Sequence, residues 1–199
     1  ILSCIKLNKH TMTLKDRPAL LLIDIQQGLE EIAYYGGHRN NIDAETKAAH
    51  LLRFWRTNDL PIVHIKHNGT SPSPLAKGLP GNNFKKIVQP ELNEKVIEKD
   101  VNSAFIGTSL KEFLDEEQIL QVILVGLTTD HCVSSTARMA KNLGYDTYVI
   151  SDATATFDKI GPTNKKHTAE EIHEVTLASL NQEFATILET ETLLTKLTH

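Results

Sequence analysis

The chain alternates between continuous apolar runs and amphipathic segments. The runs at residues 19–25 and 121–125 are almost entirely aliphatic, which is typical of strands that are buried on both faces of a sheet. Residues 43–57 instead repeat their apolar positions at helical spacing, which predicts a helix with one buried face. The same patterns predict further strands at residues 61–65, 95–98, 145–150 and 184–188, and helices at residues 108–116, from 134 onward and at 169–180.

Strands that alternate with helices in this way predict a parallel sheet with right-handed crossovers. We therefore expect an α/β fold of three layers, α/β/α, with a doubly wound, mainly parallel, six-stranded sheet of the Rossmann-like type. Ligands of such sheets bind at the carboxyl ends of the strands. The loop at residues 66–90 is rich in Gly, Pro, Ser and Asn and is too long for a plain connector, so it is a candidate cover for a site.

Composition and charge narrow the possibilities. The chain has 199 residues, of which 40% are apolar and 23% charged, as expected for one globular domain. We expect this domain to span residues 12–199, with residues 1–11 as a peripheral N-terminal extension. The net charge of −4, without a block rich in Lys and Arg, argues against nucleic acid or a membrane surface as partner. No stretch approaches the roughly 18 apolar residues of a membrane span.

Two cysteines, Cys4 and Cys132, do not make a disulfide framework, so we expect a cytoplasmic protein. Cys132 follows the apolar run 122–125, a glycine at Gly126 and a short polar turn, and helical spacing begins directly after it. Unpaired backbone N–H groups and the helix dipole at such a position favour a thiolate and bind an oxyanion. The position therefore predicts a nucleophile with a lowered pKa.

Two charged residues are expected at the same edge of the sheet. Asp24 ends the first predicted strand, and Lys99 follows the third. A carboxylate beside a thiol can take its proton and return it to a leaving amine, and an ammonium group stabilises both anions. Position alone leaves other interpretations open for each: Cys132 as a small buried residue, Asp24 as a loop cap and Lys99 as a solvated charge.

Three segments of the sequence resemble the isochorismatase-like cysteine hydrolases. They are LIDIQ at residues 22–26, KDVNSAF at residues 99–105 and GLTTDHCV at residues 126–133, and the resemblance covers residues 13–195. SDATATF at residues 151–157 fits the same pattern. Within the family, the chain looks most like the branch of streptothricin-hydrolase type, whose members open amides and a lactam. This likeness comes from residues 71–75, 80–82, 101–108 and 153–158.

The resemblance implies a catalytic triad of Asp24, Lys99 and Cys132. In the family, the cysteine attacks an amide carbonyl, the aspartate moves the proton, the lysine orients and polarises, and water hydrolyses the resulting thioester. A cis peptide bond before the cysteine maps onto Leu127–Thr128. It implies an oxyanion hole formed by the backbone N–H groups of Thr128 and Cys132.

The resemblance also bears on cofactors and partners. The nicotinamidase branch binds a metal through an Asp-x-His pair after the second strand, and residues 67–69 here are His, Asn and Gly. We therefore expect no metal and no other cofactor, and we do not expect His64 and His67 to form a metal pair. The expected partner is a small-molecule amide. Because the family commonly forms assemblies, we also expect a homo-oligomer, a dimer or a tetramer.

Candidate substrate-binding residues come from the same segments and from the ends of the strands. Ordinary core packing is an alternative interpretation for both phenylalanines among them. The candidates are Gln26, Asn68, Phe105, His131 and Phe157.

Three other functions remain possible on the sequence alone. Hydrolysis of a vinyl ether, the isochorismatase reaction, needs a proton donor at carbon and no thiol, so Cys132 argues against it. A catalytically silent binding or assembly protein would not need all three triad residues. A redox role for Cys132 would usually need a resolving cysteine, and the sequence has no Cys-x-x-Cys pair.

Overall fold

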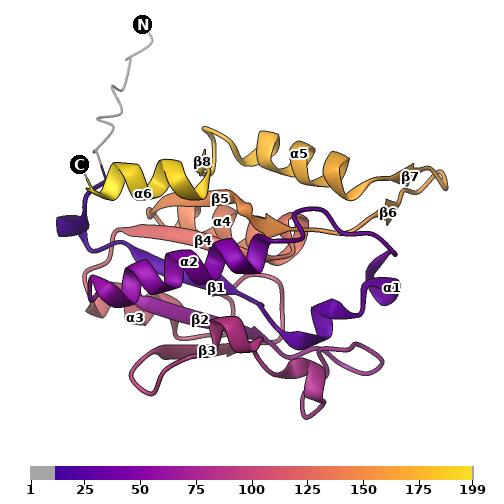
Figure 1. Ribbon diagram of the computed structural model, residues 1–199, viewed down its shortest axis with the longest axis horizontal. Helices are drawn as coiled ribbons and strands as arrows, with labels where there is room; N and C mark the ends of the chain where they lie inside the picture. Colours follow the sequence, from indigo (N-terminus) through magenta and orange to yellow (C-terminus); the bar gives the residue numbers. More distant parts are fainter. Residues whose placement is uncertain (1–11, 199) are drawn as a thin grey trace, which may run out of the picture.

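The computed structural model describes residues 12–198, so the predicted extension at residues 1–11 lies outside the described residues. Its elements follow one another as strand, helix and strand for most of the chain (Figure 1). In chain order they are β1 (Ala19–Ile23), α1 (Ile32–Tyr35), α2 (Ala44–Thr57), β2 (Ile62–His67), β3 (Lys95–Lys99), α3 (Leu110–Glu116), β4 (Gln121–Leu127), α4 (Ser134–Asn142), β5 (Asp146–Ala155), β6 (Lys159–Ile160), β7 (Lys166–His167), α5 (Ala169–Leu180), β8 (Thr186–Leu188) and α6 (Thr190–Thr198).

The central sheet has six strands in the order β3-β2-β1-β4-β5-β8, and every neighbouring pair is parallel. The order reverses direction between β1 and β4, as in a doubly wound fold. The predicted fold class is therefore confirmed. The strand pair β6 and β7 is antiparallel and forms a separate hairpin that projects beyond the sheet, on the right in Figure 1.

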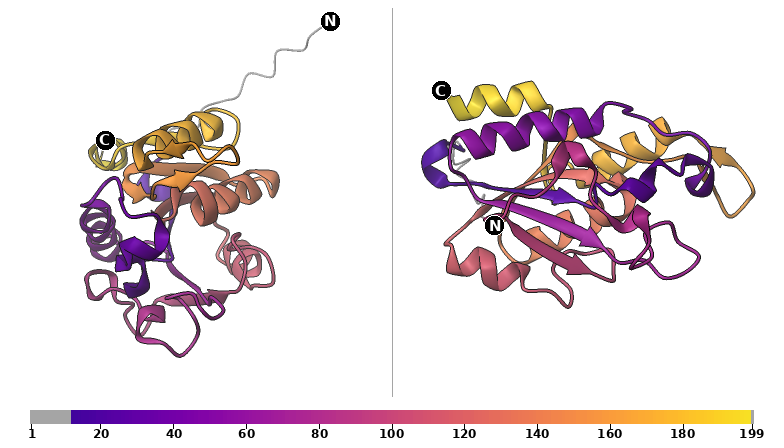
Figure 2. Two further views of the ribbon diagram at one scale, coloured as in Figure 1. Left: turned by 90° about the vertical axis from the view of Figure 1, so that its right-hand side faces the viewer. Right: turned by 60° about the horizontal axis from the view of Figure 1, so that its bottom comes forward.

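Helices cover both faces of the sheet (Figure 2), and an apolar core lies on each face. Residues Leu20 and Leu22 of β1 face the core under α2 and α6, whereas Leu21 and Ile23 face the core under α3, α4 and α5. This alternation is the two-residue period of a strand with both faces covered. It explains why the sequence of β1 shows a continuous apolar run, with all five residues buried.

Several boundaries differ from the sequence prediction. Strand β5 continues to Ala155 instead of ending at Ile150, because its pairing with β4 resumes after an irregularity opposite Leu124 and Gly126. The α6 helix and the β6–β7 hairpin were not predicted. No helix within residues 12–198 is long and apolar enough to cross a membrane.

Candidate active site

Asp24 sits immediately after β1, where the chain leaves the sheet. Its backbone has a φ of 51°, a left-handed conformation that few residues other than glycine adopt. Its amide N–H donates to the carbonyl of Ile65 in β2 (3.0 Å), and its own carbonyl accepts from Gln26 (2.8 Å). These contacts hold the carboxylate over the end of the sheet, where it is only 2% exposed.

Lys99 is the last residue of β3, and its ammonium group has three acceptors. Nζ lies 2.7 Å from Asp24 Oδ2, 3.3 Å from Cys132 Sγ and 3.2 Å from His67 Nδ1. Three acceptors match the three protons of an ammonium group. The structure thus brings the three predicted triad residues together around one buried positive charge.

The backbone changes conformation sharply after β4, and this change positions Cys132. The Leu127–Thr128 peptide bond is cis, as the resemblance implied. The next residues, Thr129–Val133, form a π-helical turn that runs into α4, and Cys132 is 9% exposed in it. π-helical turns are frequent at functional sites because they displace side chains from the regular helical positions.

Gly126 permits the approach of β4 to β1 just before this turn. Its φ is 117°, and a Cβ atom there would lie 2.0 Å from the carbonyl oxygen of Ile23. A side chain at this position would push apart the two strands that carry Asp24 and Cys132. The glycine therefore fixes the spacing of the triad.

The charge environment of Cys132 differs from the sequence prediction. Burial, and next the negative charge of Asp24, raise the pKa of the thiol well above its ordinary value, although Lys99 acts in the opposite direction. The prediction of a lowered pKa assumed an exposed thiol at a helix start, and the thiol is buried beside a carboxylate. The resting group is a neutral thiol. Oδ1 of Asp24 is buried without a hydrogen-bond partner and is available to take the thiol proton.

We expect iodoacetamide to alkylate Cys132 slowly at pH 6 and faster as the pH rises, because only the thiolate reacts. Asp24→Asn is expected to increase the rate at neutral pH, since it removes the negative charge that raises the thiol pKa and leaves Lys99 in place. The measurement is the rate of mass increase of the intact protein, in a Cys4→Ser background. Rapid, pH-independent alkylation of the wild-type thiol would contradict this description of the resting state.

His67 is a site residue that the sequence analysis missed, because it considered this histidine only as a metal ligand. His67 pairs with Lys99 in the register of β2 and β3, so the two side chains project from the same face of the sheet. Burial and the charge of Lys99 lower the pKa of His67. The imidazole is therefore neutral, and we assign Nδ1 as the acceptor for Lys99.

The arrangement does not suit a resident metal ion. Among the described residues, one group of potential ligands brings three donor atoms within 4.8 Å of one another: Asp24, His67 and Cys132. The Lys99 ammonium group lies against a ligand atom of each of these residues. A metal ion would need the same lone pairs and would have to displace a buried cation. Lys99 therefore supplies, next to Asp24 and Cys132, the positive charge that a metal ion would otherwise provide.

Two of the predicted substrate-binding residues use their side-chain amides within the protein. Gln26 donates through Nε2 to the carbonyls of His67 (3.0 Å) and Asn82 (2.8 Å), and its Oε1 accepts from the His67 N–H (2.8 Å). Asn68 donates to Glu98 (2.9 Å) and accepts from Asn82 (3.2 Å). Through these contacts, the side chain of Gln26 holds the backbone of His67 in place at the end of β2.

The other three predicted residues occupy different surroundings. Phe105 lies in the same core as Cys132 and stacks on Tyr145, with ring centroids 5.8 Å apart. Phe157 lies in the opposite core. His131 is exposed beside Cys132, with Nε2 3.3 Å from a carboxylate oxygen of Asp130. The predicted oxyanion hole at the N–H groups of Thr128 and Cys132 stays a prediction.

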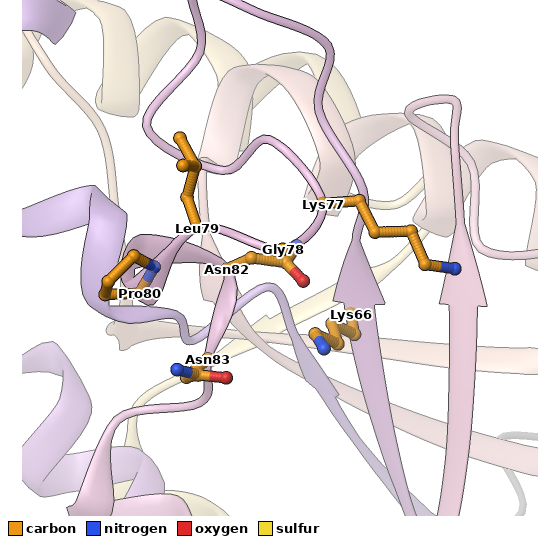
Figure 3. A pocket seen from close by; sticks show the side chains of 7 residues that line it. All are labelled: Lys66, Lys77, Gly78, Leu79, Pro80, Asn82 and Asn83. Carbon is orange, nitrogen blue, oxygen red and sulfur yellow. The ribbon is translucent and has the colours of Figure 1, made fainter.

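An open pocket of about 380 Å³ lies beside the loop that follows β2 (Figure 3). Lys66 lines it, and Lys66 and His67 are neighbours in a strand, so their side chains point to opposite faces of the sheet. The pocket therefore lies on the other side of β2 from the Lys99 ammonium group. Its lining residues are Lys66, Lys77, Gly78, Leu79, Pro80, Asn82 and Asn83.

Comparison with known proteins identifies the family. The isochorismatase domain model matches residues 18–192. The chain belongs to the isochorismatase family. The isochorismatase family protein YrdC of Bacillus subtilis is 42% identical over 184 residues, covering 91% of this chain and 96% of that protein. A crystal structure of an isochorismatase-family protein from Chromobacterium violaceum superimposes with a TM-score of 0.88 at 38% identity, over 92% of this chain and 94% of that one.

The isochorismatase family is hydrolytic, and it includes amidohydrolases. Nicotinamidase 3 of Arabidopsis thaliana is 28% identical over 189 residues, which covers 88% of this chain and 86% of that protein. Streptothricin hydrolase of Streptomyces noursei and maleamate amidohydrolase of Pseudomonas putida match over 70% and 68% of this chain. The resemblance inferred from the three sequence segments is thus confirmed at the level of the family.

Proposed function

We propose that this isochorismatase-family protein hydrolyses a C–N bond of a small-molecule amide or lactam through a thioester intermediate. The observation that carries the proposal is the buried cluster in which the Lys99 ammonium group touches both Asp24 and Cys132 while Asp24 keeps one oxygen without a partner. That cluster contains a nucleophile, a base for its proton and a cation that stabilises both anions. The named amidohydrolases among its relatives support the same reaction class.

In the proposed first half-reaction, the Cys132 thiol transfers its proton to Asp24 while Sγ bonds to the amide carbonyl carbon. The resulting oxyanion accepts hydrogen bonds from the N–H groups of Thr128 and Cys132. Collapse of this intermediate breaks the C–N bond, and Asp24 returns the proton to the leaving nitrogen. An acyclic amide gives a free amine and an acyl group bound to Sγ as a thioester, whereas a lactam gives an opened chain on Sγ that carries its own amino group.

In the second half-reaction, Asp24 takes a proton from a water molecule as that water attacks the thioester carbonyl. The C–S bond breaks, the acid leaves, and the proton goes back to the sulfur. Lys99 holds the carboxylate in position and stabilises negative charge on Asp24 and on sulfur in turn. His67, by accepting the third proton of the ammonium group, fixes the direction of the other two.

The proposal predicts that an acyl-enzyme can be trapped. Wild-type protein would be mixed briefly with nicotinamide, ureido acids, maleamate and lactams, quenched in acid and weighed intact. For an acyclic amide we expect an added mass on the protein equal to the acyl group and release of the amine. A lactam should add its whole mass and release nothing, because its amino group stays on the acyl chain. The yield should be the same after dialysis against EDTA. Two results would contradict the thioester mechanism. One is amide hydrolysis that gives no mass adduct and continues after Cys132 has been alkylated. The other is hydrolysis of a vinyl ether by the alkylated protein.

A further inference from the structure

Cys132 Sγ touches a polar side chain on its exposed side as well as the buried Lys99. On the buried side, Lys99 Nζ lies 3.3 Å from the sulfur, in a side chain that is 0% exposed. On the other side, Oδ1 of Asn102 lies 3.8 Å from Sγ and accepts from the thiol. Asn102 is an exposed residue in the turn that follows β3, so it marks the side from which a substrate reaches the sulfur. The mechanism proposed above gives this side-chain amide no role.

The turn that carries Asn102 is fixed to the helix that begins after Cys132. The N–H of Ala104 donates to Oγ1 of Thr136 in α4 (3.1 Å), and both residues are fully buried. Thr136 lies about one helical turn further along the chain than Cys132. Phe105, the next residue of the turn, packs into the same apolar core as Cys132. These contacts hold the backbone on both sides of the contact between Oδ1 and Sγ in one rigid unit.

The thiol occupies the Asn102 acceptor only weakly. An S–H group is a weak hydrogen-bond donor. Within residues 12–198, Oδ1 of Asn102 accepts from no other side chain and from no backbone N–H group. In this respect it differs from the amides of Gln26 and Asn68, which bind other parts of the protein. The Asn102 carboxamide is therefore free to accept from a stronger donor that arrives beside the sulfur.

The scissile nitrogen of an amide fits the space next to this acceptor. A carbonyl carbon that is about to be attacked lies about 3–3.5 Å from its nucleophile, and the amide C–N bond is about 1.33 Å long. The nitrogen then lies about 4 Å from Sγ, so its N–H can reach Oδ1 of Asn102 at the usual hydrogen-bond distance of about 2.9 Å. The carbonyl oxygen is an acceptor and would be repelled by Oδ1, so it turns toward the predicted oxyanion hole at Thr128 and Cys132.

We propose that Asn102 is a specificity-determining residue, whose Oδ1 accepts a hydrogen bond from an N–H group on the scissile nitrogen of the substrate. This inference rests on the proposed function and names its substrate class: amides and lactams that carry an N–H, in preference to esters, lactones and N,N-disubstituted amides. The hydrogen bond strengthens as Asp24 returns the proton and the nitrogen gains positive charge, so it favours departure of the amine. When the substrate N–H occupies Oδ1, the thiol proton is left to Asp24.

Asn102→Leu tests the inference, with Asn93→Leu as the matched control. Leucine keeps the size of the side chain and removes the acceptor, whereas Asn93 is equally exposed but precedes β3, at the opposite edge of the sheet. The substrates are an amide and the methyl ester of the same acid, which form the same thioester. For Asn102→Leu we expect kcat/KM to fall by about tenfold or more on the amide and by less than about threefold on the ester.

The ratio of the two substrates distinguishes recognition from support of the fold. If Asn102 only held the turn or the sulfur in place, its replacement would slow the amide and the ester alike. Equal losses on both substrates, or an unchanged ratio of amide to ester, would therefore overturn the inference. The control Asn93→Leu should give wild-type values on both substrates.

A binding measurement separates this inference from the proposed function. Ligand-detected NMR of Cys132→Ala needs no turnover and compares nicotinamide with methyl nicotinate, and 2-pyrrolidinone with γ-butyrolactone. We expect added Asn102→Leu to weaken binding of the amide and the lactam by about tenfold and to change the ester and the lactone much less. The inference is wrong if neither the amide nor the lactam binds, or if both members of each pair respond alike. If affinities change as expected but no acyl-enzyme can be trapped, the thioester mechanism alone is overturned.

Discussion

Cys132→Ala is expected to reduce the hydrolysis of any amide substrate by more than about 10⁴-fold, the range seen when a covalent nucleophile is removed. The reason is that Asp24 alone can activate water, but it cannot form the acyl intermediate that divides the reaction into two easier steps. The protein should remain folded, since a small buried side chain is exchanged for a smaller one. The measurements are kcat/KM on the best substrate and thermal unfolding.

Two further variants sharpen this prediction. Cys132→Ser keeps a hydroxyl near Lys99 but should be nearly as inactive as alanine, because an alcohol loses its proton far less readily than a thiol. Cys4→Ser is the matched control for general loss of cysteine and should keep wild-type activity. If Cys132→Ala retained more than about a tenth of the wild-type kcat/KM, covalent catalysis by this residue would be excluded.

The sequence was sufficient to predict the sheet and to place Asp24, Lys99 and Cys132 at one edge of it, whereas their role as a triad was implied by the family resemblance and stays a prediction. Strands buried on both faces need continuous apolar runs, and the residues at which those runs end must lie at one edge of a parallel sheet. Asp24 follows the apolar run of β1, and Cys132 lies in the turn that follows β4, whereas Lys99 ends the edge strand β3, in which Val96 and Glu98 are exposed. The boundaries were less predictable, because strand β5 is extended by pairing with residues beyond the irregularity at Gly126, which depends on distant contacts.

The details of the site could not be predicted from the sequence because they depend on the direction of side chains and on burial. His67 became visible as a site residue only through its register with Lys99. The side-chain amide of Gln26 holds the backbone of β2, which the sequence did not indicate, and its contact with substrate stays a prediction. The predicted fall in the thiol pKa had the wrong sign, because Cys132 is buried beside Asp24, and its position near the start of a helix does not reveal that burial.

The pairing of Asp24 with Lys99 leads to a prediction about stability as well as activity. Their side chains are 3% and 0% exposed, and the atoms Oδ2 and Nζ are 2.7 Å apart. Removing one partner of a buried ion pair leaves the other charge uncompensated in a poorly polarisable interior. We therefore expect Asp24→Asn to abolish hydrolysis and also to lower the free energy of unfolding by about 3–5 kcal/mol.

The double variant Asp24→Asn/Lys99→Met separates the two effects. Replacing the lysine by a side chain of similar length and no charge removes the isolated cation, so most of the lost stability should return. Hydrolysis should stay abolished, because neither the base nor the stabilising cation is present. Urea unfolding of the wild type, both single variants and the double variant gives the coupling between the two sites. If the effects of the two substitutions on the free energy of unfolding were simply additive, the buried pair would not hold the site together as described. The mechanism would then need another source for the stability of the Asp24 carboxylate.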